Sequence, residues 1–256
     1  MRIQTERKKN LENLIQKIDE NLQAKRKRKD RLSHYPSQMS IKTKNGIEGK
    51  CNLALWRNFK GIEKSNPIQP YTIWKFEMGN KVHEFIAENL KEVGYKIESE
   101  TPFKTQIEGL KYPISGRSDN IIHLPDKKIG VEVKSRYGKG FRNIKFEGLR
   151  PSDLLQIFCY LNCGVADEYI LLIINFDSGY REQYLIERKN GFLIANKELI
   201  EDISWQGIIN RLKELEDYLQ KNEMPPKDFE KKDWHCKYCE YKNLCWAVKS
   251  VEKPKN

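Results

Sequence analysis

The stretch GVEVKSRYG, residues 130–138, predicts a β-strand with two charged side chains on one face. Side chains alternate along a strand, so Val131 and Val133 point to one face while Glu132 and Lys134 point to the other. A Glu-x-Lys tripeptide is common in a chain rich in both residues, and by itself it indicates only a solvated strand face. The neighbouring segments decide between that interpretation and a functional one.

The preceding predicted strand adds a third charged side chain to this face. A hairpin with a four-residue loop buries the apolar residues of both strands on one face when Asn120 lies opposite Val133. The other face of the same hairpin then brings Asp119, Glu132 and Lys134 together. Burial of the apolar residues alone selects this register, so the charged cluster follows from it without being assumed.

Two carboxylates and a lysine in one cluster suit the metal-assisted hydrolysis of a phosphodiester. Carboxylate oxygens are the ligands that Mg²⁺ and related hard cations prefer. A bound divalent metal polarises a phosphate and lowers the pKa of its coordinated water. An ammonium group beside it orients that water or stabilises the negative charge that develops.

The composition favours an anionic partner and disfavours a membrane-spanning protein. The chain has 256 residues, with 47 Lys and Arg against 36 Asp and Glu and a formal net charge of +11. This length suits one domain with decorations, and this charge suits nucleic acid or an anionic membrane surface. The longest apolar run, YILLIINF at 169–176, is too short for a membrane span, and the N-terminus lacks the apolar region of a signal peptide. We therefore expect a cytoplasmic protein.

The predicted helices carry further polar candidates. His83 lies at the edge of an apolar stripe in the helix predicted over 74–93, where a histidine is ordinarily a core or boundary residue. Gln156 and Tyr160 lie four residues apart, on one face of the helix predicted over 151–162. The remaining predicted segments are a polar helix over 1–31 with a basic run at 25–29, a turn-rich segment over 32–50, strands over 95–100 and 103–108, a basic loop over 137–150, a hairpin over 169–187 and a helix over 196–221.

Four short motifs follow one another in an order that resembles a known nuclease family. They are Gly79-x-x-x-His83, Gly116-x-x-Asp119, Glu132-x-Lys134 and Gln156-x-x-x-Tyr160. The series resembles that of the RecB-type nucleases of the PD-(D/E)XK superfamily, over residues 51–245, with Ser118 in place of the proline. The resemblance implies an α/β (α+β) fold with a mixed-sheet, restriction-endonuclease-like core flanked by helices.

The resemblance also assigns a role to each matched residue of the charged cluster. It makes Asp119 and Glu132 ligands of Mg²⁺ or Mn²⁺, with the Val133 carbonyl as a third contact. His83 becomes a further metal ligand, and Lys134 becomes the catalytic lysine.

The helix after the basic loop completes the catalytic set implied by the resemblance. Gln156 and Tyr160 are expected to support the site and to contact the substrate strand. The residues alone suit an ordinary half-buried helix face equally well.

Cysteines near the C-terminus predict a metal centre. Cys236, Cys239 and Cys245 follow a C-x2-C-x5-C pattern, and a cytoplasmic chain favours metal or thiol chemistry over disulfides. Zinc and iron–sulfur clusters both commonly take four ligands, so a fourth is expected. Cys159 and Cys163 lie on or next to a helix, where a core role is favoured for both. The candidates for the fourth ligand are Cys51, His235, Cys159 and Cys163.

A short predicted helix follows Cys51, as in the iron–sulfur members of the same nuclease group. The resemblance therefore favours Cys51 over His235 and implies a four-iron four-sulfur cluster on Cys51, Cys236, Cys239 and Cys245. The spacing alone leaves a structural Zn²⁺ as the alternative. The expected units are a basic helical N-terminal extension (1–50), the PD-(D/E)XK nuclease core (51–222) and a C-terminal cysteine cluster segment (223–256) joined to Cys51.

Among nucleases of this group, the chain resembles the CRISPR-associated exonucleases of spacer acquisition and their phage or viral relatives. That resemblance implies a Mg²⁺- or Mn²⁺-dependent exonuclease acting on single-stranded DNA from 5′ to 3′. The long N-terminal extension favours a phage-borne member, so an integrase partner is left open, as is the oligomeric state. The alternatives are a catalytically silent DNA-binding or regulatory protein and a site-specific endonuclease of the same superfamily.

Overall fold

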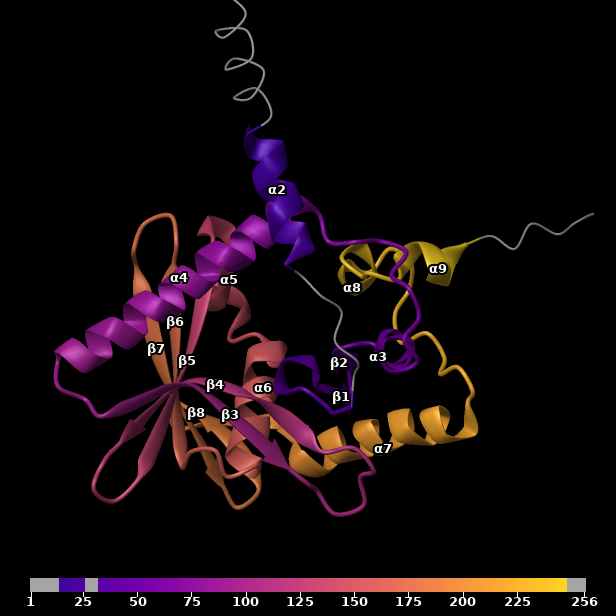
Figure 1. The fold of residues 1–256 in the computed structure, drawn as a ribbon. Coiled ribbons are helices and arrows are strands. Elements are labelled where there is room, and N and C mark those ends of the chain that lie inside the picture. Colours follow the sequence, from indigo (N-terminus) through magenta and orange to yellow (C-terminus); the bar gives the residue numbers. More distant parts are fainter. Residues whose placement is uncertain (1–13, 26–31, 248–256) are drawn as a thin grey trace, which may run out of the picture.

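The computed structural model describes residues 14–25 and 32–247 of the chain (Figure 1). The helix predicted over 1–31 is represented there by α2, and the rest of that prediction, with most of the basic run, lies outside the described residues. The helices are α2 (Leu14–Ala24), η1 (Pro36–Gln38), α3 (Asn52–Phe59), α4 (Pro70–Glu92), α5 (Gly138–Glu147), α6 (Pro151–Asn162), α7 (Trp205–Lys221), α8 (Trp234–Lys237) and α9 (Lys242–Trp246). The strands are β1 (Ser40–Thr43), β2 (Gly46–Gly49), β3 (Ile97–Thr105), β4 (Ile114–His123), β5 (Lys128–Arg136), β6 (Glu168–Asn175), β7 (Arg181–Lys189), β8 (Phe192–Ala195) and β9 (Glu198–Ser204).

A seven-stranded mixed sheet forms the centre of the molecule, in the order β3-β4-β5-β6-β7-β8-β9. Strands β5 and β6 run parallel, with α5 and α6 in the connection between them, and the other neighbouring pairs are antiparallel. Helices flank the sheet (Figure 1). The predicted fold class, a mixed α and β core flanked by helices, is confirmed. Among the described residues, no helix is both long and apolar enough to cross a membrane.

The two faces of the sheet bury different helices. The face that carries Val131 and Val133 packs against the apolar residues of α4, including Val82 and Ile86. The opposite face packs against α6 in the larger core, which also contains Tyr169. The predicted alternation along β5 therefore separates two packed layers, and it turns the even-numbered side chains of this strand toward α6.

The hairpin register differs from the predicted one by two residues. Asn120 pairs with Val131 rather than with Val133. The reason is the turn, which has a two-residue loop instead of four and closes with the Leu124 N–H donating to the Lys127 carbonyl at 2.9 Å. A shift of two residues keeps every side chain on its predicted face of the sheet. The error in the predicted register therefore does not change which face carries the charged cluster.

The basic segment 137–150 was predicted as a loop, and it contains α5 instead. Phe141 and Ile144 are three residues apart and buried in the main core, which anchors one face of the helix. The glycines of this segment conceal the pattern because glycine disfavours helix interiors.

The helix predicted over 196–221 begins only at Trp205, because β9 precedes it. Asn196 and Lys197 form the tight connection between β8 and β9, with φ angles of 47° and 74°. Two consecutive residues with positive φ are typical of a two-residue hairpin turn, in which Asn is favoured.

The turn-rich segment before Cys51 also contains a hairpin, formed by β1 and β2. Met39 and Ile41 from this segment are buried in the main core. Gly207 lies against Ile41, and a Cβ at this position would lie 2.7 Å from the Ile41 side chain. Part of the N-terminal extension therefore packs into the same core as the sheet.

Gly130 of β5 is expected not to tolerate a larger side chain. A Cβ at this position would lie 2.2 Å from a ring carbon of Tyr169, which is fully buried. We expect Gly130→Ala to lower the free energy of unfolding by about 1–3 kcal/mol, because Tyr169 has to move. Gly79→Ala is the control, since a Cβ there would meet only the Ser135 hydroxyl oxygen, at 3.5 Å. Urea unfolding of both variants measures the difference, and equal midpoints would contradict this packing argument.

Candidate active site

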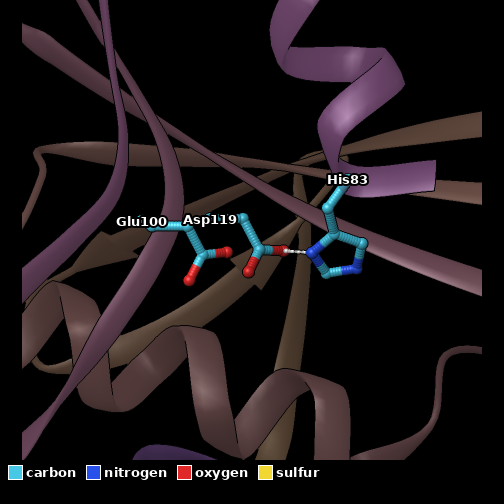
Figure 2. Close-up of side chains that lie close together, drawn as sticks. All are labelled: His83, Glu100 and Asp119. Carbon is cyan, nitrogen blue, oxygen red and sulfur yellow. Dashed lines mark ion pairs between the residues drawn. The ribbon is translucent and has the colours of Figure 1, made fainter. Parts of the chain in front are cut away.

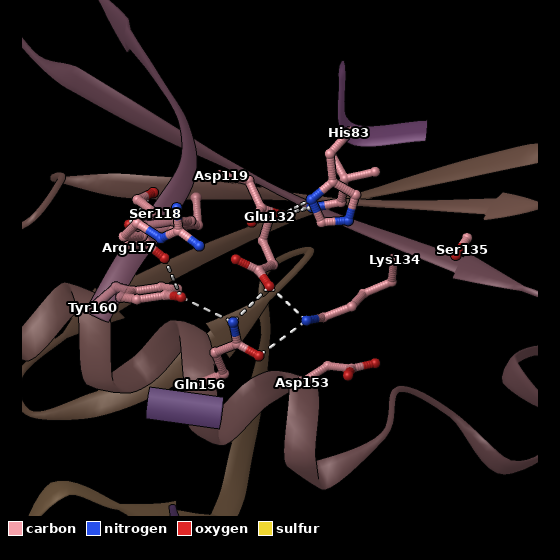
Figure 3. A network of polar contacts seen from close by, with 12 residues as sticks. His83, Arg117, Ser118, Asp119, Glu132, Lys134, Ser135, Asp153, Gln156 and Tyr160 are labelled. Carbon is pink, nitrogen blue, oxygen red and sulfur yellow. Dashed lines mark hydrogen bonds and ion pairs between the residues drawn. The ribbon is translucent and has the colours of Figure 1, made fainter. Parts of the chain in front are cut away.

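Glu132 and Lys134 of β5 meet Gln156 of α6 in a closed hydrogen-bonded triangle (Figure 3). The Lys134 ammonium donates to Glu132 Oε1 at 2.5 Å and to Gln156 Oε1 at 2.9 Å. The Gln156 amide donates to the same Glu132 oxygen at 2.7 Å. Each of the three side chains is thus held by the other two. The structure brings these three predicted site residues together.

Tyr160 extends this network along α6 to the neighbouring strand. Its hydroxyl accepts a hydrogen bond from the Gln156 amide at 2.9 Å and donates to the Arg117 carbonyl at 3.0 Å. Its ring stacks on Tyr169, whose hydroxyl shares a 3.1 Å hydrogen bond with Ser118. The buried aromatic pair fixes α6 relative to the strand segment that precedes Asp119.

Asp119 lies where β4 leaves its ladder with β5. The last paired residue is Asn120, and the Asp119 carboxylate accepts a hydrogen bond from the Val133 N–H at 2.8 Å. The N–H and C=O of one strand residue point toward the same neighbouring strand, so the Val133 carbonyl also faces the Asp119 side. His83 of α4 approaches from the other face of the sheet, with Nδ1 3.4 Å from Asp119 Oδ2.

Glu100 of β3 joins this group, although the sequence did not single it out. Ligand atoms of His83, Glu100 and Asp119 all lie within 4.8 Å of one another (Figure 2). Glu100 has a φ of 51° within an otherwise extended strand and forms an ion pair with Arg117 at 3.0 Å. The segment was predicted as two strands, which placed Glu100 at a strand end. A single strand paired with β4 would have placed it opposite Asp119.

Burial controls the protonation of the site. Glu132 is 1% exposed, and this burial raises its pKa to about 7 against the opposing effect of Lys134. Burial disfavours the charged form of Lys134, but the Glu132 carboxylate outweighs it and raises the pKa of that lysine. Burial likewise opposes the charge on His83, while its hydrogen bond with Asp119 raises the histidine pKa overall. At acidic pH, Glu132 and His83 therefore become protonated, and in that form they could not bind a metal ion.

Binding of Mn²⁺ is expected to weaken as the pH falls below about 7, because Glu132, with its pKa of about 7, then has to release a proton. His83 contributes in the same direction, since only its unprotonated ring can bind a metal. We expect a loss of up to about tenfold in affinity for each pH unit where one of these groups is protonated, and up to about a hundredfold where both are. Calorimetric titration of Mn²⁺ at several pH values, beside Glu132→Gln, measures this. Identical wild-type affinity on both sides of pH 7 would contradict the assignment.

The four cysteines expected to hold a cluster line one small cavity between the start of α3 and the segment 227–246. Cys51, Cys236, Cys239 and Cys245 all contribute to its wall. The Arg57 guanidinium of α3 donates to the sulfur of Cys245 at 2.7 Å. Beside the cavity, the Asn66 N–H donates to the Glu240 carbonyl, and the N–H groups of Asn243 and Leu244 donate to the side chains of Asn66 and Ser65.

The other fourth-ligand candidates differ in their surroundings. Cys159 is fully buried in the main core, and Cys163 packs against that core, so neither lines the cavity. His235 does line it, with Nδ1 2.7 Å from an Asp233 oxygen and its ring stacked on Phe229. Cys51 and His235 therefore both reach the cavity.

Comparison with known proteins gives structural matches only. No protein-family model matches this chain, and no curated protein matches it. The crystal structure of SSO0001 matches over 93% of this chain and 96% of its own, with 20% identity and a TM-score of 0.52. An alkaline exonuclease, LHK-Exo from Laribacter hongkongensis, matches over 67% of this chain and 80% of its own, with 13% identity and a TM-score of 0.46. LHK-Exo in complex with dAMP matches over 67% and 78%, with 13% identity and a TM-score of 0.45.

The similarity to SSO0001 concerns the fold. At 20% identity, it shows that nearly the whole chain adopts the fold of that structure. What this chain does has to be argued from its own residues.

Proposed function

We propose that this protein is a metal-dependent DNA nuclease, acting as an exonuclease on single-stranded DNA from 5′ to 3′. The observation that carries the proposal is the convergence of Asp119, Glu132 and Lys134 with His83 at one point of the sheet. Two carboxylates, an imidazole and an ammonium suit phosphodiester hydrolysis, and the net charge of +11 suits a polyanionic substrate. The preference for single strands and the polarity come from the family resemblance.

The donor set fits Mg²⁺ or Mn²⁺. Glu132 Oε2 is buried and has no hydrogen-bond partner among the described residues, as expected for an oxygen that binds a cation. Asp119, His83 and the Val133 carbonyl supply further donors on the same side, and Glu100 lies next to them. When bound there, the metal would lower the pKa of a coordinated water and polarise the phosphate.

The protein side chains then position the reacting groups. The Lys134 ammonium is fixed by Glu132 and Gln156, so one of its protons remains to orient the attacking water or to stabilise charge on the phosphate. Gln156 is hydrogen-bonded to both Lys134 and Glu132, and Tyr160 is hydrogen-bonded to Gln156. We therefore assign Gln156 and Tyr160 to positioning the catalytic pair.

We further propose that Cys51, Cys236, Cys239 and Cys245 hold a four-iron four-sulfur cluster. The four thiols line one small cavity, as ligands of a single metal group would, and the family resemblance favours an iron–sulfur cluster over Zn²⁺. Arg57 and nearby lysines would offset the negative charge of four thiolates. The cluster would fasten the two ends of the chain around the nuclease core.

The mode of cleavage is tested with linear and circular single-stranded DNA in Mn²⁺. An exonuclease degrades the linear strand and leaves the circle intact because the circle has no end. With a label at either end, 5′-to-3′ digestion releases the 5′ label first as a short product. Cleavage of circles would replace the exonuclease by the endonuclease alternative, and binding without cleavage of either form would favour the regulatory one.

A further inference from the structure

Two rows of polar side chains run side by side away from the catalytic pair. Along β5, Lys134 is followed two residues later by Arg136 on the same face. Along α6, Gln156 is preceded by Asp153 at helical spacing, and Arg150 is the extended N-cap residue just before the helix. The rows touch twice, because Lys134 donates to Gln156 and Arg136 Nη2 lies 2.5 Å from an Asp153 oxygen. Figure 3 shows Asp153 below Lys134 on the same side of the site.

Within the described part of the chain, the far end of these rows has a guanidinium group without a direct ion pair. Arg136 is paired with Asp153, whereas the Arg150 side chain has no hydrogen-bond or ion-pair partner among the described residues. Both arginine side chains lie beside Gly140 of α5. A Cβ at that position would be 3.1 Å from Arg150 Nη2 and 4.0 Å from Arg136 Cδ. Glu147 is the other carboxylate with an influence on Arg150, and both its oxygens accept from the Asn143 amide, at 3.0 Å.

The electrostatics agree with an open anion site. Burial, and then the nearby Arg136 charge, lower the pKa of Arg150. Arg136 Nε is also buried, with no hydrogen-bond partner among the described residues. One carboxylate, Asp153, thus lies between two guanidinium groups, and an added anion would relieve the repulsion between them.

We propose that Arg150, beside the Arg136–Asp153 pair, binds a phosphate of the DNA strand. This phosphate would be next to the one that is hydrolysed on the same strand. This inference rests on the proposed nucleic-acid substrate. A guanidinium donates two parallel hydrogen bonds to a phosphate, which suits an exposed arginine with no other partner. Arg136 is two residues along β5 from Lys134, roughly 7 Å, so the contact would fall close to the reacting phosphate.

The test is DNA binding without metal, by fluorescence anisotropy of a labelled single strand in EDTA over about 50 to 200 mM salt. Arg150→Gln is expected to weaken binding by about tenfold and to reduce the slope of log affinity against log salt by about 0.7. Arg150→Lys should retain the slope. Arg142→Gln, an exposed arginine of α5, is the matched control and should leave both unchanged.

Single methylphosphonate substitutions, each of which removes the charge of one phosphate, locate the contact. One position should weaken binding by the wild type and leave Arg150→Gln unaffected. Wild-type affinity and slope in Arg150→Gln, or equal sensitivity of both proteins at every position, would overturn the inference. Hydrolysis is not needed for this test, so a wild type that binds with this pattern yet never cuts would refute the nuclease proposal and leave the phosphate contact standing.

Discussion

Asp119→Asn is expected to lose hydrolysis of single-stranded DNA by about a thousandfold or more while still binding the strand. The change keeps the size of the side chain and its hydrogen bond from the Val133 N–H, but it removes one of the charges that would hold the proposed metal. The several kcal/mol that a metal ion contributes to charge stabilisation are then lost from the transition state. Initial rates of strand degradation in Mn²⁺, with binding measured in EDTA, separate the two effects.

The matched control is Asp126→Asn, an exposed aspartate in the turn that follows β4. It should hydrolyse DNA at the wild-type rate. Lys134→Gln should lose activity like Asp119→Asn, because the water or the phosphate loses its ammonium partner. If Asp119→Asn retained most of the activity while the control did too, hydrolysis would have to occur elsewhere on the molecule.

Cys236→Ser is expected to lose the iron content of one four-iron cluster, together with its broad visible absorbance. Because the cluster would fasten the C-terminal segment to α3, we also expect the free energy of unfolding to fall by several kcal/mol. Cys163→Ala is the control, since Cys163 packs against the main core and does not line the cysteine cavity. Iron and zinc analysis of anaerobically purified proteins, followed by thermal unfolding, measures both effects.

The metal content of the wild-type protein in the same experiment identifies which metal the cysteines bind. About one zinc per chain, without iron, would replace the cluster by the structural Zn²⁺ alternative. If the wild type contained neither iron nor zinc, and Cys236→Ser were as stable as the wild type, both the cluster and the structural Zn²⁺ would be excluded.

The local pattern of the sequence predicted what depends on neighbouring residues. The alternation in β5 placed Glu132 and Lys134 on one face because the period of a strand is two. The same reasoning put Gln156 and Tyr160 on one face of α6. The contact between these two faces was implied by the family resemblance, since nothing in the spacing of separate segments shows that they meet.

The features that the sequence missed depend on backbone geometry or on tertiary burial. The hairpin register required the turn type, and the position of Glu100 required that β3 be one continuous strand. Helix α5 contains glycines, so only the burial of Phe141 and Ile144 explains it. The proposed role of Arg150 was hidden for the same reason, because the lack of a side-chain partner among the described residues appears only once α5, α6 and β5 are assembled.

The most direct test of the central claim is the loss of end-labelled single-stranded DNA in the presence of wild-type protein, with Mn²⁺, with EDTA, and with Mn²⁺ restored after EDTA. We predict degradation with Mn²⁺, none in EDTA, and recovery when Mn²⁺ returns. A wild-type protein that binds the strand but degrades neither linear nor circular DNA with Mg²⁺ or Mn²⁺ would contradict the account.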